Sequence, residues 1–207
     1  MNAAGPTAER IYEALKAYVL RGIFRPGARL DPAVLADQLN SSVTPVRAGL
    51  NVLTGEGLVE TGTGEGFHIP LIDEPALKDR YAWNAEILAI ALRKARTPPA
   101  ARREVEEAGN SAVRAATLFL EIGRWSPNHE HARAISLMND RLHAARIGET
   151  GVLGDIDGEL DEIADAIGRC DETALRPMIA RYHRRRSRSA AAILRQLYRM
   201  DELPPAE

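Results

Sequence analysis

The chain has 207 residues, of which 45% are hydrophobic, a formal net charge of −2 and a single cysteine, Cys170. This length supports one or two domains with substantial cores, and one cysteine excludes a disulfide framework or a cysteine zinc site within one chain. The aromatic fraction of 5% favours packed helices over sheets. Without a run of 18 apolar residues or a signal-peptide pattern, we expect a cytoplasmic protein with no membrane span.

The first predicted helix runs from Thr7, which can cap it, to about Arg21. Ile11 and Leu15 lie on one apolar face of this helix, and Gly22 is its stop signal. We expect this helix to pack beneath the pair of helices that follows.

Two helix start signals come next. Asp31-Pro32 begins a short helix, because Asp can accept from the free N–H groups of the first turn and Pro fits the first helical position. Asn40-Ser41-Ser42 reads as a turn, and Thr44-Pro45 predicts the second helix, with Thr44 as its cap. The apolar stripe of this second helix is Val46, Leu50 and Leu53, and its opposite face carries Thr44, Arg47, Asn51 and Thr54.

A hairpin is expected after the second helix. Residues 58–60 and 67–69 read as short strands around a Gly-rich turn at 62–66. Three helices and a small β-hairpin wing make a winged helix-turn-helix, in which the second helix of the pair enters a major groove of DNA.

Several separate motifs in this stretch resemble those of a known family. They are Arg25-Pro26-Gly27 with Leu30, the run from Val43 to Arg47, Leu50, Leu53, the run from Glu56 to Val59, and Gly66-Phe67. In this order and spacing they resemble the DNA-binding domain of GntR-family bacterial transcription regulators. The helical remainder resembles the FadR-type branch, whose C-terminal FCD domain binds a small acid and dimerises. The resemblance implies a homodimer on a palindromic double-stranded DNA operator and an organic acid as effector.

The expected DNA-binding residues lie at the start of the second helix and in the wing. Arg47 points away from the apolar stripe and can reach a phosphate or a guanine edge. The chain departs from the family at Val43, where relatives carry Arg, at Ala48-Gly49, where they carry Glu-Ala, and in its acidic wing. The full set is Ser42, Val43, Thr44, Arg47, Asn51 and Gly64.

Residues 1–72 hold six Lys or Arg and seven Asp or Glu, a net charge of −1. Phosphate contacts supply most non-specific DNA affinity, so we expect weak binding by a monomer and a dimer that doubles each contact.

Two prolines between residues 69 and 75 mark a linker. We therefore expect a DNA-binding domain at 1–72 and, at 76–200, an all-α helical bundle that binds the effector and dimerises, in a mainly α fold. Helices are predicted at 77–96, from Thr97-Pro98 to Gly123, from Ser126-Pro127 onward, around 160–167, and from Asp171 or Thr173 to Met200.

Many members of the FadR-type branch bind a divalent metal through three histidines and an acidic residue. The matching positions here are Ala132, Leu160 and Tyr182, none of which is an imidazole ligand. His131 could substitute only if its helix were rotated by about 100° per residue step. We expect no metal and no cofactor.

The helical bundle offers a place for an effector site without metal; the alternative is that larger side chains fill the same space. Its expected lining could bind a carboxylate or a polar ring. The residues are Asn84, Asn128, His131, Tyr182 and Arg186.

The basic run from Arg181 to Arg188 could mimic a nucleic-acid arm, but its charges surround the helix axis, which favours a solvated helix balanced by the acidic segment 155–171. Trp83 and Trp125 are expected in the core or at a dimer interface. No enzyme motif is recognisable. The alternative to a regulator is a dimeric small-molecule-binding or protein-interaction protein that has lost specific DNA recognition.

Overall fold

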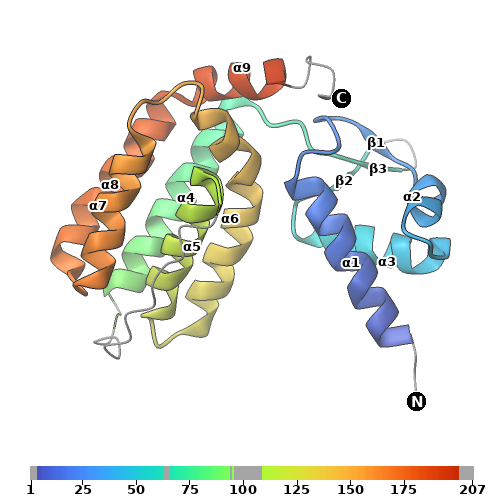
Figure 1. Cartoon of the computed structure of the whole chain (residues 1–207), viewed down its shortest axis with the longest axis horizontal. Helices are drawn as coiled ribbons and strands as arrows, with labels where there is room; N and C mark the ends of the chain where they lie inside the picture. Colours follow the sequence, from blue (N-terminus) through green and yellow to red (C-terminus); the bar gives the residue numbers. More distant parts are fainter. Residues whose placement is uncertain (1–3, 63–65, 94, 96–108, 201–207) are drawn as a thin grey trace. The chain divides into compact units, whose positions relative to one another are not determined.

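The computed structural model describes residues 4–62, 66–93, 95 and 109–200 (Figure 1). The chain divides into two compact units, residues 1–72 and 73–207. The N-terminal unit combines three helices with a small sheet, and the described part of the C-terminal unit is helical. The predicted fold class, a mainly helical chain with a winged helix-turn-helix followed by a helical domain, is confirmed.

The N-terminal unit follows the expected order of helices. Its elements are α1 (Ala4–Leu20), β1 (Arg29–Leu30), α2 (Pro32–Gln38), α3 (Val43–Gly55), β2 (Glu60–Thr61) and β3 (Phe67–His68). Asp31 caps α2 as predicted, since its Oδ1 accepts a hydrogen bond from the backbone N–H of Ala33 at 2.8 Å. Helix α1 begins at Ala4, so the prediction that Thr7 starts it was wrong.

The wing is a three-stranded antiparallel sheet in the order β1-β3-β2, rather than the predicted hairpin alone. Gly27 adopts a left-handed φ of 78° and donates its N–H to Ile69 O at 2.8 Å. Ile69 in turn donates to Ala28 O at 3.0 Å. This turn lays β1 beside β3, with Leu30 opposite Phe67. A strand of two residues is too short for an alternating pattern, so the sequence did not reveal it.

The core of the N-terminal unit holds α3 against α1. Leu50 and Leu53 of α3 are fully buried with Ile11 and Leu15 of α1. Gly49 makes the close approach possible, because a Cβ there would lie 2.9 Å from Leu15 Cδ1. The predicted apolar stripe of the second helix is thus the face that fixes α3 to the unit and leaves its other face to solvent.

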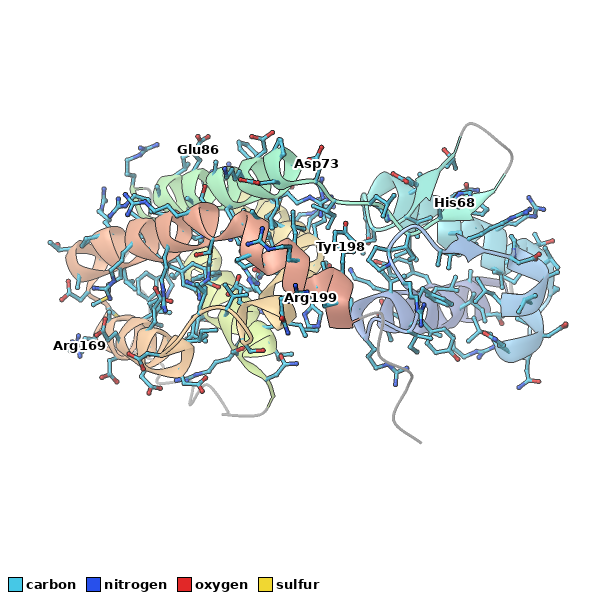
Figure 2. The ribbon with its side chains drawn as sticks, turned by 90° about the horizontal axis from the view of Figure 1, so that it is seen from above. His68, Asp73, Glu86, Arg169, Tyr198 and Arg199 are labelled. Carbon is cyan, nitrogen blue, oxygen red and sulfur yellow. The ribbon has the colours of Figure 1, made fainter. Side chains whose placement is uncertain are left out.

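The described helices of the C-terminal unit are α4 (Glu74–Arg93), α5 (Ser111–Arg124), α6 (His129–Glu149), α7 (Ile156–Gly168), α8 (Glu172–Arg188) and α9 (Ala190–Met200). They pack around one apolar core, with α5 on α6 and α4 on α8. Trp125 is buried in this core, whereas Trp83 on α4 is half exposed. Figure 2 labels Asp73, whose Oδ1 accepts from the backbone N–H of Ala76 at 2.8 Å, and Tyr198 on the last helix.

Three predictions about these helices need correction or fall outside the described residues. The predicted last helix is broken at Ser189, whose N–H turns back to Arg186 O at 3.0 Å. Helix α6 is capped by Asn128, whose Oδ1 accepts from Glu130 N at 3.0 Å, and not by Ser126. The predicted start of a helix at Thr97 lies outside the described residues. Across the residues that the structure does describe, no helix combines the length and apolarity that a membrane crossing requires.

Candidate functional site

The solvent face of α3 carries most of the residues that the sequence assigned to DNA contact. Arg47 and Asn51 are exposed one turn apart, opposite the buried Leu50 and Leu53. Ser42, Val43 and Thr44, at the beginning of the helix, are exposed as well. The structure therefore brings five of the six predicted residues to one helix face and its start. The sixth, Gly64, lies outside the described residues.

The cap of α3 differs from the prediction. Ser42 is the N-cap residue and its side chain makes no capping hydrogen bond, while Thr44 lies inside the first turn. The prediction that Thr44 caps the helix was wrong. As a result, no capping side chain of the described residues occupies the first-turn N–H groups of α3, and these groups can bind an anion such as a phosphate.

The solvent face of α3 is also partly apolar. Val43 is 38% exposed and Val52 is 51% exposed, and Arg47 is the only basic residue of the helix. Val34 on α2 is 53% exposed. Exposed valines cannot bind phosphate, but they can contact the methyl group of thymine in a major groove.

A polar cluster fastens the end of α3 to α1. The hydroxyl of Tyr12 donates to Glu56 Oε1 at 2.7 Å, and Lys16 Nζ lies 3.5 Å from Glu56 Oε2. Burial, reinforced by the hydrogen bond to Glu56, raises the pKa of Tyr12 above its ordinary value, so the hydroxyl stays protonated as the donor. This cluster positions the helix and does not reach its solvent face.

A second polar cluster lies inside the helical unit. The guanidinium of Arg186 is fully buried, and its Nε donates to Glu149 Oε2 at 2.8 Å and its Nη1 to Glu159 Oε2 at 2.7 Å. The hydroxyl of Tyr81 donates to Glu149 Oε1 at 2.8 Å. Arg186 also stacks on the ring of Tyr182, with 3.2 Å from the guanidinium carbon to the ring centroid. Paired and hydrogen-bonded in this way, the charges can remain in a low-dielectric interior.

His183 and Asn84 continue this cluster. His183 Nδ1 donates to Ile179 O at 2.8 Å, so Nε2 carries the lone pair and accepts from Asn84 Nδ2 at 3.0 Å. Burial lowers the pKa of His183 to about 3, and the nearby charges of Arg146 and Arg186 lower it as well. The imidazole is therefore neutral at physiological pH.

Arg146 on α6 is a buried charge that the sequence analysis missed. It is 1% exposed, its Nη1 donates to Asn139 Oδ1 at 3.0 Å, and its guanidinium carbon lies 5.2 Å from the centroid of Phe119. Glu149 and Glu159 were missed too. A signal existed in α6, because the apolar spacing of Ile135, Met138 and Leu142 continues with charged residues at Arg146 and Glu149.

The five residues predicted to line an effector site separate into two places. Asn84, Tyr182 and Arg186 meet in the buried cluster. Asn128 is the exposed cap of α6, and His131 Nδ1 lies 2.8 Å from Ser126 Oγ. Both belong to the beginning of α6, whereas the cluster uses residues 139–149 of that helix, so the structure does not bring Asn128 and His131 to it.

None of the three positions that match the metal histidines carries an imidazole. Leu160 and Tyr182 are buried in the core, and Ala132 packs near Gly123. Among the described residues, no three His, Cys, Asp or Glu side chains gather closely enough to hold a metal ion.

The basic run on α8 is paired with α7, as the sequence analysis favoured. Arg181 forms an ion pair with Glu162, and Arg185 Nη1 lies 3.3 Å from Glu159 Oε2. Arg186 is turned into the interior. This arrangement is a charged helix surface balanced by acidic neighbours rather than a stripe that follows a nucleic-acid backbone.

The fold and the exposed face of α3 define the N-terminal unit as a winged helix-turn-helix of the DNA-binding class. Residues 7–69, within the N-terminal unit, match the model of bacterial regulatory proteins of the gntR family. The chain is 40% identical over 72 residues to the Nta operon transcriptional regulator of Aminobacter aminovorans, covering 35% of this chain and 34% of that protein. It is 32% identical over 95 residues to the HTH-type transcriptional regulator McbR of Escherichia coli, covering 45% and 43%. The match thus spans less than half the length of these curated relatives.

Solved structures extend the likeness to the helical unit at the level of fold. Escherichia coli McbR/YncC superposes with a TM-score of 0.63 at 19% identity, over 92% of this chain and 98% of that one. A putative transcriptional regulator GntR from Rhodococcus sp. RHA1 gives a TM-score of 0.68 at 16% identity, over 90% and 98%. The proteins that this chain resembles are transcription regulators and not enzymes.

Proposed function

We propose that the protein is a transcription regulator that binds double-stranded DNA sequence-specifically through α3. The observation that carries this proposal is the solvent face of α3 within a gntR-family domain. Arg47 and Asn51 present a guanidinium and an amide, the two groups best suited to guanine and adenine edges. Ser42, Thr44 and the uncapped first turn supply phosphate donors.

The regulator acts as a homodimer on a palindromic operator in the cytoplasm. A net charge of −1 on residues 1–72 supports this, because a dimer doubles the few phosphate contacts of each domain. Two-fold symmetry of the protein then matches two half-sites about one helical turn apart.

The helical unit modulates operator affinity through a small organic acid, as in the FadR-type branch with its FCD domain. Support comes from the buried polar cluster of Asn84, Tyr182 and Arg186, which places charged and hydrogen-bonding groups inside an apolar core. Such a ligand changes DNA affinity only by the difference between its affinities for the two conformations of the dimer.

Selection of bound sequences from a random DNA pool tests the DNA-binding proposal. The full chain and an Arg47→Ala variant are compared at roughly physiological ionic strength, where the electrostatic contribution is moderate. The proposal predicts a palindromic consensus for the full chain that is lost or degraded in the variant. Equal, unenriched pools for both proteins would refute it.

The second candidate is a small-molecule-binding or protein-interaction protein without specific DNA recognition. The exposed Val43, in place of the arginine of relatives, favours it, together with the single basic residue of α3. Salt dependence separates the two candidates, because a specific operator complex keeps a large preference over other DNA while weakening steeply with salt.

A further inference from the structure

The guanidinium of Arg146 is a buried cation that has no counter-ion among the described residues. Among the described residues, no carboxylate lies within ion-pair distance of Arg146, and its Nε and Nη2 have no hydrogen-bond partner. Its polar partner is the neutral amide of Asn139. A buried charge left without a partner costs more free energy than a native core ordinarily tolerates.

Two further unsatisfied atoms accompany Arg146 in the same cluster. In the described part of the chain, Nη2 of Arg186 is buried without a partner, although the rest of that guanidinium is paired. The Oδ1 atom of Asn84 is buried and has no donor among the same residues. The hydrogen bond from His183 Nδ1 to Ile179 O fixes the ring tautomer, which in turn fixes the Asn84 amide with Nδ2 toward His183 and Oδ1 away from it.

These groups surround one set of aromatic rings. Arg146 lies over the ring of Phe119, whose centroid is 4.9 Å from that of Tyr182 and 5.6 Å from that of His183. Arg186 stacks on Tyr182. The unsatisfied atoms are therefore three donor atoms on two guanidinium groups and one neutral acceptor, on side chains that share one set of aromatic rings.

We propose that Arg146 anchors the carboxylate of a small hydroxy or amino acid inside the helical unit, with the hydroxyl or amino group of that ligand donating to Asn84 Oδ1. A carboxylate satisfies the Nε and Nη2 fork of Arg146 in bidentate geometry. Nη2 of Arg186 supplies a further donor to the same anion. This inference rests on the proposed ligand-responsive function of the helical unit, and it names the chemistry of the ligand and its anchor.

The first test uses the ligand-free full chain and asks whether Arg146 is structural. Arg146→Met keeps a long, unbranched side chain and removes its charge. Arg186→Met makes the same change at the arginine that has two carboxylate partners. The proposal predicts an unchanged or higher midpoint of thermal unfolding for Arg146→Met, because binding groups are retained at the expense of stability. Arg186→Met should lower the midpoint by several degrees. An equal loss in both variants would make Arg146 a structural residue and overturn the proposal.

The second test measures binding with lactate, propionate and lactamide as probes, by the shift in the unfolding midpoint. Lactate should stabilise the full chain most, propionate less because it lacks the hydroxyl, and lactamide least because it lacks the charge. The lactate shift should vanish in Arg146→Met and persist in Arg133→Met, which alters an exposed arginine of the same helix. Equal shifts in both variants, or no shift with either carboxylate, would overturn the proposal.

These measurements need no DNA, so their outcome is independent of the operator selection. A failed selection with a persisting lactate shift would refute the DNA-binding function alone. A successful selection without any carboxylate shift would refute the Arg146 site alone.

Discussion

The carboxylate of Glu149 accepts hydrogen bonds from two buried side chains, Arg186 and Tyr81. Replacing Glu149 with Gln removes the negative charge and leaves Arg186 with Glu159 as its remaining carboxylate. We expect Glu149→Gln to lower the free energy of unfolding by about 3 kcal/mol, which is the usual loss when one partner of a buried ion pair is removed. Urea unfolding followed by circular dichroism measures this change.

Glu130→Gln is the matched control on the same helix. Glu130 pairs with Arg133 in a largely exposed geometry, and exposed pairs contribute about 0–1 kcal/mol. Similar losses in the two variants would show that the buried cluster is not an energetic centre of the helical unit.

His183 makes stability depend on pH. Its folded-state pKa of about 3 lies below the unfolded value of about 6.5, so the unfolded chain binds a proton that the folded chain excludes. This contribution is absent above pH 6.5 and destabilises the folded state increasingly as pH falls toward 3. We expect wild type to lose about 1.4 kcal/mol per pH unit more than His183→Gln over this range. Glutamine can still accept the hydrogen bond from Asn84. Urea unfolding at several pH values gives the dependence of the unfolding free energy on pH for both proteins. Parallel slopes would contradict the lowered pKa of His183.

Val43 offers a test, by addition of charge, of the proposal that the solvent face of α3 contacts DNA. Val43→Arg places a cation at the beginning of α3, so non-specific DNA affinity should rise and the log–log salt slope should steepen by about 0.9 for each arginine that contacts a phosphate, or about 1.8 for a dimer. Val113→Arg is the control, because Val113 is 39% exposed, as Val43 is 38% exposed, and lies in the helical unit. Fluorescence anisotropy over a salt series measures both, and equal steepening would place DNA contact elsewhere.

At the scale of elements, Gly123 sets how closely α5 approaches α6. A Cβ on Gly123 would meet Ile135 Cδ1 at 2.8 Å and the backbone Cα of Ala132 at 3.1 Å. The backbone of Ala132 cannot move aside as easily as the end of a flexible side chain. Gly123→Ala should therefore destabilise the helical unit by about 1–3 kcal/mol. Gly168→Ala, with open space around the added methyl group, should have little effect. Thermal unfolding compares the two, and a stable Gly123→Ala variant would mean that the helices can separate without loss.

The elements of the N-terminal unit were largely predictable, because local signals and tertiary packing agree there. Asp31 caps α2, and the Val46, Leu50 and Leu53 stripe is buried. Strand β1 was missed because its two residues depend on pairing with β3, which lies far away in the sequence. The break at Ser189 was missed because the residues on both sides have helical patterns.

The interior of the helical unit was predictable only in part. Asn84, Tyr182 and Arg186 were predicted to line an effector site in the helical bundle, and all three are buried there. Arg146 and Glu149 were not predicted to be buried, since charged residues are ordinarily assigned to the surface. Their burial depends on partners from other helices, and spacing along one helix carries no information about those partners.

At the scale of the whole molecule, the chain contains a winged helix-turn-helix, for which we propose DNA binding, and a helical unit with a buried polar cluster. The central claim is that α3 recognises DNA sequence-specifically. The net charge of residues 1–72 is unfavourable for binding through phosphate attraction alone, so the proposal depends on the contacts that α3 makes.

The most direct test is the ratio of dissociation constants for the selected palindrome and a shuffled duplex, measured with the full chain and with Arg47→Ala at roughly physiological salt. We expect the full chain to bind the palindrome about 1,000-fold or more tightly than the shuffled duplex. This preference should be smaller in Arg47→Ala. A ratio near one for the full chain would contradict specific recognition by α3 and leave ligand or protein binding as the function.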